Sequence, residues 1–117
     1  MNITRLGVGP RLSRAVIHGD TIYLTGCIAD LAKGKNVREQ TREVLATIDR
    51  LLAEAGSDKT KLLSAQIYLA KIAAYEEMNA EWDVWISEGS PPARATFEAK
   101  LPLSGTSVMI ACIAARG

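Results

Sequence analysis

The chain has 117 residues, 48% of them hydrophobic and 23% charged, which is the size and composition of a single globular domain over residues 1–117. The formal net charge is only +1, which argues against nucleic acid or an acidic membrane as a partner. No apolar run approaches a membrane span or a signal peptide, and Cys27 and Cys112 lack metal-ligand spacing, so we expect a cytoplasmic protein with reduced, buried thiols.

The first half of the chain predicts a β-hairpin followed by a long helix. Residues 14–17 and 21–25 have the β-branched and aromatic composition of strands, and His18-Gly19-Asp20 between them has that of a tight turn. Apolar residues then recur at helical spacing from position 37 to position 55. Asn36 is placed to cap this helix and Gly56 to end it, so both of its boundaries are predicted.

Residues 62–88 are predicted to form a strand followed by a second helix. Residues 62–69 alternate in character, and one face of this strand is predicted to carry Leu63, Ala65, Ile67 and Leu69. A helix with an apolar stripe is expected over residues 72–88. Gly89 is expected to end that helix, and the prolines at 91 and 92 prevent its continuation.

Two strands, over residues 93–99 and 107–115, complete the order β-β-α-β-α-β-β. This order predicts an α+β fold, a sheet with two helices on one face. The last strand is apolar at successive positions from Val108 to Ala114, which is typical of a strand buried on both sides. Because a two-layer domain leaves one face of its sheet uncovered, we expect another subunit to cover it.

Arg94 is the residue on which we expect the function to depend. It follows the rigid pair Pro91-Pro92 at the start of a predicted strand, between aliphatic neighbours. A planar guanidinium pairs with both oxygens of a carboxylate and stays charged at any working pH, so this arginine is suited to anchor a small carboxylate. An ion pair with a purely structural role is the alternative interpretation.

Other catalytic chemistries find little support in the sequence. His18, the one histidine, lies in a predicted turn, which argues against serine or cysteine triads. Cys27 has no evident basic setting that would lower the pKa of its thiol, so a structural role is expected. The glycines match neither a phosphate-binding loop nor a dinucleotide motif, and clusters of metal ligands are absent, so no cofactor is expected.

Five short pieces of the chain, taken together in order and spacing, resemble one known family. They are Val16-Ile17-His18, Ile22-Tyr23-Leu24-Thr25-Gly26, Glu39-Gln40-Thr41, Met78-Asn79-Ala80-Glu81-Trp82 and Pro92-Ala93-Arg94. From about Leu12 to Ala115 the chain is similar to the Rid family of imine deaminases, also called the YjgF or endoribonuclease L-PSP family. Within that family it resembles the short YoaB-like members.

The resemblance implies a chorismate-mutase-like fold, a homotrimer with a barrel-like centre, and clefts between its subunits. It implies hydrolysis of 2-imino acids to 2-keto acids and ammonia, with the substrate carboxylate bound by Arg94. Backbone groups near Gly26 and Thr96 are expected to position the attacking water, although Thr96 replaces the family's usual cysteine. Asn79 matches an asparagine of the family's cleft region.

Three further positions of the expected cleft depart from the family. Leu12 stands where members carry an aromatic residue, and Cys27 where many carry a glutamine. Met109 replaces a glutamate that orients the water, so weak activity or a shifted substrate is expected. Two alternatives stay open: a protein that binds a 2-keto acid or related small carboxylate without catalysis, and an endoribonuclease, which the near-neutral charge disfavours.

Overall fold

The fold is that of a computed structural model, which describes residues 1–86 and 90–117. Its elements, in chain order, are β1 (Ile3–Leu6), β2 (Ala15–His18), β3 (Thr21–Leu24), β4 (Cys27–Ile28), α1 (Val37–Glu54), the 3₁₀ turn η1 (Lys59–Lys61), β5 (Leu62–Leu69), the 3₁₀ turn η2 (Ile72–Ala74), α2 (Tyr75–Trp85), β6 (Ala93–Glu98) and β7 (Val108–Ala115). The predicted helices and strands are all present, and most of their described boundaries lie within one residue of the prediction.

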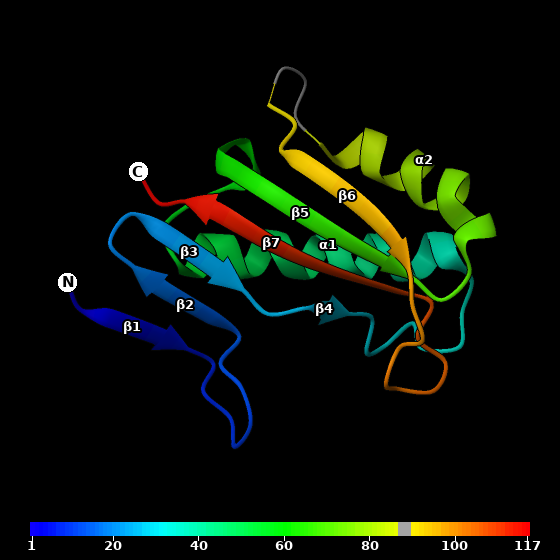
Figure 1. The fold of residues 1–117 in the computed structure, drawn as a ribbon, viewed down its shortest axis with the longest axis horizontal. Helices are drawn as coiled ribbons and strands as arrows, with labels where there is room; N and C mark the ends of the chain where they lie inside the picture. The colour runs from blue at the N-terminus through cyan, green and yellow to red at the C-terminus, as the bar shows by residue number, and fades with distance from the viewer. Residues whose placement is uncertain (87–89) are drawn as a thin grey trace.

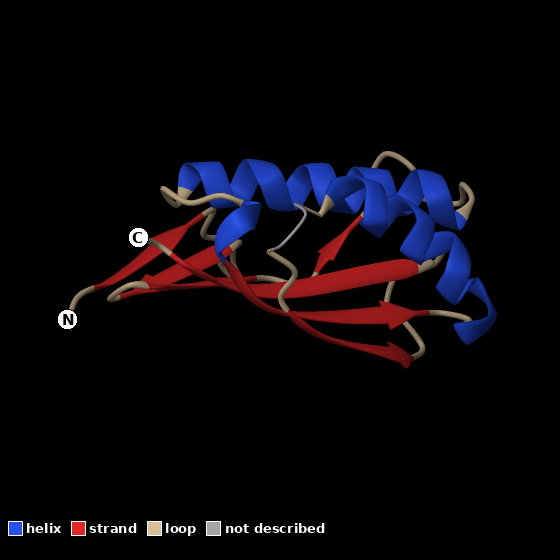
Figure 2. Cartoon of the chain, turned by 90° about the horizontal axis from the view of Figure 1, so that it is seen from above, coloured by secondary structure: helices blue, strands red, loops and turns tan. Residues whose placement is uncertain are grey.

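The strands form one mixed sheet in the order β1-β2-β3-β7-β5-β6, with β4 paired to β7 (Figure 1). The strand pairs are antiparallel except for β5 and β6, which run parallel. β6 is the last strand in this order and is therefore an edge strand. Both helices lie on one face of this sheet, and its other face is left open (Figure 2). The prediction of an α+β fold with two helices on one face is therefore confirmed.

The core lies between the helices and the sheet. Side chains of β7 alternate, so Val108, Ile110, Cys112 and Ala114 are buried on the helix-covered face. The apolar stripe of α1 packs against them with Val44, Ile48, Leu51 and Leu52. Asn36 caps α1, since its side-chain oxygen accepts a hydrogen bond of 2.9 Å from the amide of Glu39, as the sequence predicted.

One face assignment in β5 is wrong. Leu63 was expected in the core, but it is 51% exposed, whereas Leu62 is buried. The register of β5 against β7 shifts between Leu62 and Ser64, as at a β-bulge. A bulge inserts one residue and exchanges the faces of the side chains that precede it, so the alternation resumes as predicted only from Ala65 onward.

The second helix is shorter than predicted, and two short strands were missed. The predicted helix over 72–88 begins with the turn η2, and α2 itself ends at Trp85 with Ile86 as its cap. The predicted end at Glu88 and the stop at Gly89 lie outside the described residues. β1 and β4 have only four and two residues, too few for a periodic pattern to indicate a strand.

The open face of the sheet is apolar, as the composition of the last strand led us to expect. It carries the second set of β7 side chains, among them Met109, Ala111 and Ile113, which are only partly buried in the single chain. Tyr23 and Phe97 on neighbouring strands are 46% and 47% exposed.

Cys27 and Cys112 are free and buried. Among the described residues, no helix is both long and apolar enough to cross a membrane.

Candidate functional site

Arg94 belongs to β6, which is an edge strand of the sheet. Helix α2 runs beside this strand (Figure 1). Its Nη2 donates a hydrogen bond of 3.1 Å to the hydroxyl of Tyr75. Its Cζ lies 5.7 Å from the centre of the Tyr75 ring and 5.3 Å from that of Trp82. Two aromatic side chains of α2 thus hold the guanidinium in place by cation–π contact, and one of them also accepts a hydrogen bond.

The guanidinium of Arg94 has no carboxylate partner within the described residues. The ion pairs found among those residues join Glu81 of α2 to Arg38 and Arg42 of α1. The structural ion pair considered for Arg94 is therefore absent from the described chain. Four of its five N–H donors keep the capacity to bind a ligand, since only one bond, to Tyr75, is made there.

A cavity of about 440 Å³ opens beside Arg94 and is lined by Ile72, Tyr75, Arg94 and Thr96. Arg94 and Thr96 share this cavity because alternate residues of a strand point the same way. Arg94 pairs with Ala65 of β5, and Thr96 pairs with Ile67, both of which are buried beneath the helices. The arginine cavity thus belongs to the edge of the helix-covered face.

A second cavity, of about 410 Å³, lies on the open face of the sheet. It brings together three of the predicted site residues, Leu12, Gly26 and Met109, and its further lining is Thr25, Ile28, Tyr68, Pro102, Leu103, Thr106 and Ala111. Gly26 lies close to Met109, because a Cβ at position 26 would lie only 2.8 Å from Sδ of Met109 unless that side chain moved. We call this the open-face pocket.

The predicted site residues therefore form two separate groups within one chain. Met109 pairs with Tyr68, whereas Arg94 pairs with Ala65, and these two β5 residues point to opposite faces of the sheet. Arg94 and Thr96 belong to the rim of the helix-covered face, and Leu12, Gly26 and Met109 line the open-face pocket. No rearrangement of side chains could bring the two groups together through the sheet.

Asn79 lies on α2 between the two aromatic residues that hold Arg94. Its Nδ2 donates a hydrogen bond of 3.3 Å to Glu76. Its Oδ1 is buried and has no hydrogen-bond partner among the described residues. Asn79 lines neither of these two cavities, and its contact with substrate stays a prediction.

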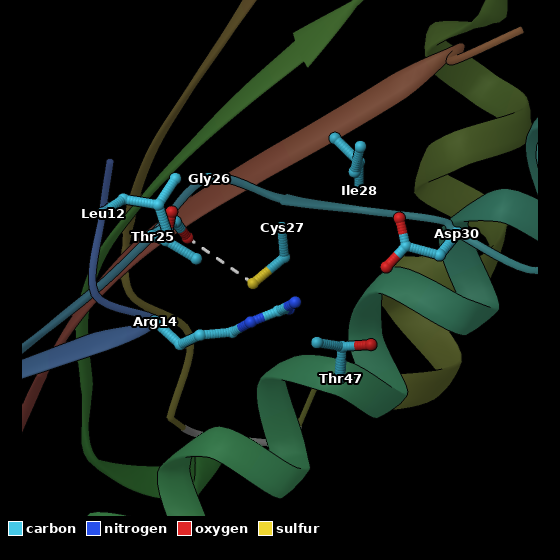
Figure 3. Close-up of a pocket in the computed structure, with 8 residues that line it drawn as sticks. All are labelled: Leu12, Arg14, Thr25, Gly26, Cys27, Ile28, Asp30 and Thr47. Atoms are coloured by element: carbon cyan, nitrogen blue, oxygen red, sulfur yellow. Dashed lines mark hydrogen bonds between the residues drawn. The ribbon is translucent and has the colours of Figure 1, made fainter. Parts of the chain in front are cut away.

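Cys27 points away from the open-face pocket, toward helix α1. It pairs with the buried Ile110, and its thiol donates to the carbonyl of Thr25 at 3.5 Å. It lines a smaller cavity of about 180 Å³, into which the side chain of Arg14 extends toward Thr47 (Figure 3). Burial raises the pKa of this thiol to about 11, although nearby Arg14 and Arg50 oppose the shift. The thiol is therefore protonated at neutral pH.

Several cavity residues were not singled out by the sequence. Tyr75 lies within the helix predicted over residues 72–88, and no pattern in the sequence indicated that its hydroxyl contacts Arg94. Thr106 carried no signal at all, because it reaches the open-face pocket through the loop before β7. Gln40 holds that loop, since its Nε2 donates to the carbonyl of Gly105 at 2.9 Å and its Oε1 accepts from the amide of Ser107 at 2.8 Å.

Known proteins resemble this chain over nearly its whole length. A "RutC family protein" of Haemophilus influenzae is 45% identical over 114 residues, covering 97% of this chain and 98% of that protein. The "RutC family protein YoaB" of Escherichia coli is 38% identical over 115 residues, covering 98% and 99%. The crystal structure of NMB1025 from Neisseria meningitidis, described as a member of the YjgF family, superimposes with a TM-score of 0.96 at 43% identity and covers 100% of this chain and 97% of its own.

A more distant relative has a named activity. The "2-iminobutanoate/2-iminopropanoate deaminase" of Bos taurus is 32% identical over 115 residues, covering 94% of this chain and 82% of that protein. Residues 3–116 match the family described as Endoribonuclease L-PSP. The chain therefore belongs to the endoribonuclease L-PSP family, which is the Rid or YjgF family that the sequence resembles.

Proposed function

We propose that this protein hydrolyses 2-imino acids to 2-keto acids and ammonia, with Arg94 binding the substrate carboxylate. The observation that carries this proposal is the state of Arg94: a guanidinium held by two aromatic rings, beside a cavity, without a carboxylate partner among the described residues. Arg94 is only partly buried, so its remaining N–H donors are accessible and can pair with a carboxylate that enters the cavity. The deaminase named among the relatives supports the same substrate class.

We further propose that the site is completed by a second copy of the chain. Arg94 lies on an edge strand, and the open-face pocket lies on the opposite face, so one chain presents the two groups outward in different directions. The exposed apolar side chains of the open face favour its burial against another subunit. In a closed trimer, the rim of each chain would meet the open face of the next, which places Arg94 of one copy at the open-face pocket of another.

The chemistry needs a positioned water more than a strong base. Water adds to the carbon of the protonated C=N bond, a proton moves to the nitrogen, and ammonia leaves as the C=O bond of the 2-keto acid forms. Met109 offers no acid or base for this transfer. Backbone groups near Gly26 and Thr96 are our candidates to hold the water, and orientation alone accelerates the hydrolysis of so reactive a substrate.

The test is release of ammonia and keto acid from 2-iminopropionate and 2-iminobutyrate generated in situ. We expect the native protein to accelerate release, and Arg94→Ala to lower kcat/KM by about 100-fold, as loss of a charged partner does. Arg50→Ala is the matched control, because Arg50 is an exposed arginine of α1 remote from both large cavities, and it should keep native rates. Equal activity of Arg94→Ala and native protein would refute the assignment.

Tyr75→Phe tests how Arg94 is held. The change removes the hydroxyl that accepts from Nη2 and keeps the ring beneath the guanidinium. We expect KM to rise by about three- to tenfold, the loss of one modest hydrogen bond. An effect as large as that of Arg94→Ala would instead indicate that the hydroxyl touches the substrate.

Binding without catalysis is the second candidate function. The observation that favours it is the apolar open-face pocket, in which Leu12 and Met109 supply no group for proton transfer. A protein of this kind would be stabilised by a 2-keto acid, with a rise in Tm that Arg94→Ala abolishes, while imine hydrolysis stays at the spontaneous rate.

A further inference from the structure

We infer that the preferred substrates are 2-imino acids whose side chains are apolar and longer than ethyl. This inference rests on the function proposed above, and it names the substrate class of the same site. The open-face pocket carries the inference, through its lining, its volume and the close contact between Gly26 and Met109.

The lining of the open-face pocket is apolar and uncharged. Six of its side chains are aliphatic, namely Leu12, Ile28, Pro102, Leu103, Met109 and Ala111. No charged residue lines the cavity within the described part of the chain. In the proposed assembly Arg94 of a second copy is engaged by the substrate's own carboxylate. A charged substrate side chain placed in the pocket would then lose its hydration without gaining a further ionic partner, so the pocket selects against it.

The polar groups of the pocket are few, and one of them is already engaged. The hydroxyl of Tyr68 donates to Gln66 at 2.9 Å. The hydroxyl of Thr106 is buried and has no partner among the described residues. The hydroxyl of Thr25 also lines the pocket and has no side-chain hydrogen bond among the described residues. Two separate hydroxyls offer less than an amide or a carboxylate needs, because these groups present several donors or acceptors together. The pocket therefore accepts a hydrocarbon chain more readily than a polar side chain of equal length.

The volume of the pocket exceeds what a short substituent would fill. The cavity measures about 410 Å³, while a methyl group is comparable to a water molecule, whose share of liquid volume is about 30 Å³. In the proposed assembly a second chain and the imino acid head group take up part of this space. The side chains of 2-iminopropionate and 2-iminobutyrate have only one and two carbons, so they would still leave part of the apolar lining without contacts. Each further methylene that enters an apolar pocket should raise kcat/KM by about fourfold.

Part of the pocket wall is held in place. Gln40 ties down the loop that carries Pro102 and Leu103, while the thioether of Met109 packs against Gly26 as a flexible part of the wall. The anchored loop limits collapse of the pocket, so a longer side chain gains contacts that a shorter one cannot make.

The experiment compares imines generated in situ by an amino acid oxidase from alanine, 2-aminobutyrate, norvaline and norleucine, with glutamine as the polar counterpart of norleucine. We expect kcat/KM to rise along the series, by on the order of fiftyfold from the alanine-derived to the norleucine-derived imine. The glutamine-derived imine should fall back to the level of the short substrates or below.

Two variants that narrow the pocket test its role directly. Ala111→Leu narrows the pocket from strand β7, and Leu103→Phe narrows it from the loop before that strand. If one variant fails to fold or assemble, the other still tests the pocket. In both, the ratio of norleucine-derived to alanine-derived kcat/KM should fall by about tenfold.

The outcomes separate this inference from the proposed function. A flat or falling series, with Arg94-dependent hydrolysis of the short imines, would overturn the preference for long side chains and leave the deaminase assignment standing. An unchanged ratio in both narrowed variants would also overturn it, because the open-face pocket would then not hold the side chain. No acceleration for any member of the series would overturn both proposals.

Discussion

The two faces of the sheet differ in how complete they are. The helix-covered face is closed by the chain's own α1 and α2, and the alternate residues of β7 there are almost fully buried. The open face carries equally apolar residues of the same strand, among them Met109 and Ile113, and leaves them partly exposed. One face stabilises the fold, and the other is available for a second chain and a ligand.

The comparison also explains where the candidate functional residues lie. Arg94 and the aromatic residues that hold it are at the rim of the closed face, whereas Leu12, Gly26 and Met109 line the pocket of the open face. A site that draws on both must form between chains. Under the proposed function, activity therefore depends on assembly, whereas the folded core is formed by other residues of the single chain.

The largest expected effect comes from placing one charge on either face of β7. Ile110→Asp would bury an unpaired carboxylate beneath the helices, where Ile110 is fully buried, and should cost about 4 kcal/mol or more in the free energy of unfolding. Ile113→Asp on the open face should leave the chain folded but dissociate the oligomer. Circular dichroism with urea unfolding, and light scattering for particle mass, check the two results.

The difference between the effects of Ile110→Asp and Ile113→Asp tests whether the two faces of the sheet have different roles. If Ile113→Asp unfolds the chain as severely as Ile110→Asp, the open face supports the single chain and our distinction between the faces is wrong. A variant at 113 that remains fully oligomeric would show that this face is not the contact between subunits.

A smaller effect is expected at Gln40, which links the two regions. Its fully buried side chain bonds the backbone at Lys35, Gly105 and Ser107. The carbonyl of Gly105 also accepts from the amide of Gly34, so Gln40→Leu leaves the carbonyl of Lys35 and the amide of Ser107 without partners among the described residues. We expect the free energy of unfolding to fall by about 3 kcal/mol. Glu54→Leu, at an exposed position of the same helix, is the control and should change it by less than about 0.5 kcal/mol. Equal unfolding midpoints for both variants would argue against the anchoring role.

The smallest effect concerns the buried thiols of the closed face. Burial raises the pKa of Cys27 to about 11, and burial together with nearby Cys27 raises that of Cys112 to about 12. Alkylation by iodoacetamide at pH 8 should therefore be slow in the folded protein and fast after denaturation.

The same shift has a consequence for stability at alkaline pH. A folded-state pKa above the unfolded value of about 8.5 stabilises the fold fully below that pH, and the contribution is lost as pH rises toward about 11. Cys27→Ala should flatten this decline in the free energy of unfolding. An unchanged slope in the variant, or rapid alkylation of the folded protein, would contradict the assignment of a buried protonated thiol.

The elements of the fold were predictable because their signals are local. The helical spacing of α1, its cap at Asn36 and the alternation of β7 each follow from a short stretch of sequence. The bulge that exposes Leu63 depends on the pairing of β5 with β7, which no local pattern reveals. The strands β1 and β4 were too short to leave a pattern.

The candidate site was predictable in its residues but not in its arrangement. The sequence points to Arg94 through its proline pair and to Gly26 and Met109 through the family resemblance. The faces on which these residues lie depend on the parallel pairing of β6 with β5 and the antiparallel pairing of β7 with the same strand. The hydroxyl of Tyr75 bonds to Arg94 only because α2 folds back over the sheet edge, which is a tertiary contact.

The most direct test of a site shared between chains is complementation between two inactive variants. Arg94→Ala removes the carboxylate anchor, and Ala111→Trp fills the open-face pocket, so each variant alone should lack imine hydrolysis. Co-expressed chains that mix at random in a closed ring should recover about a quarter of native activity, because one contact in four pairs an intact arginine with an intact pocket. Mixed oligomers, verified by mass spectrometry, that stay inactive would contradict the shared site.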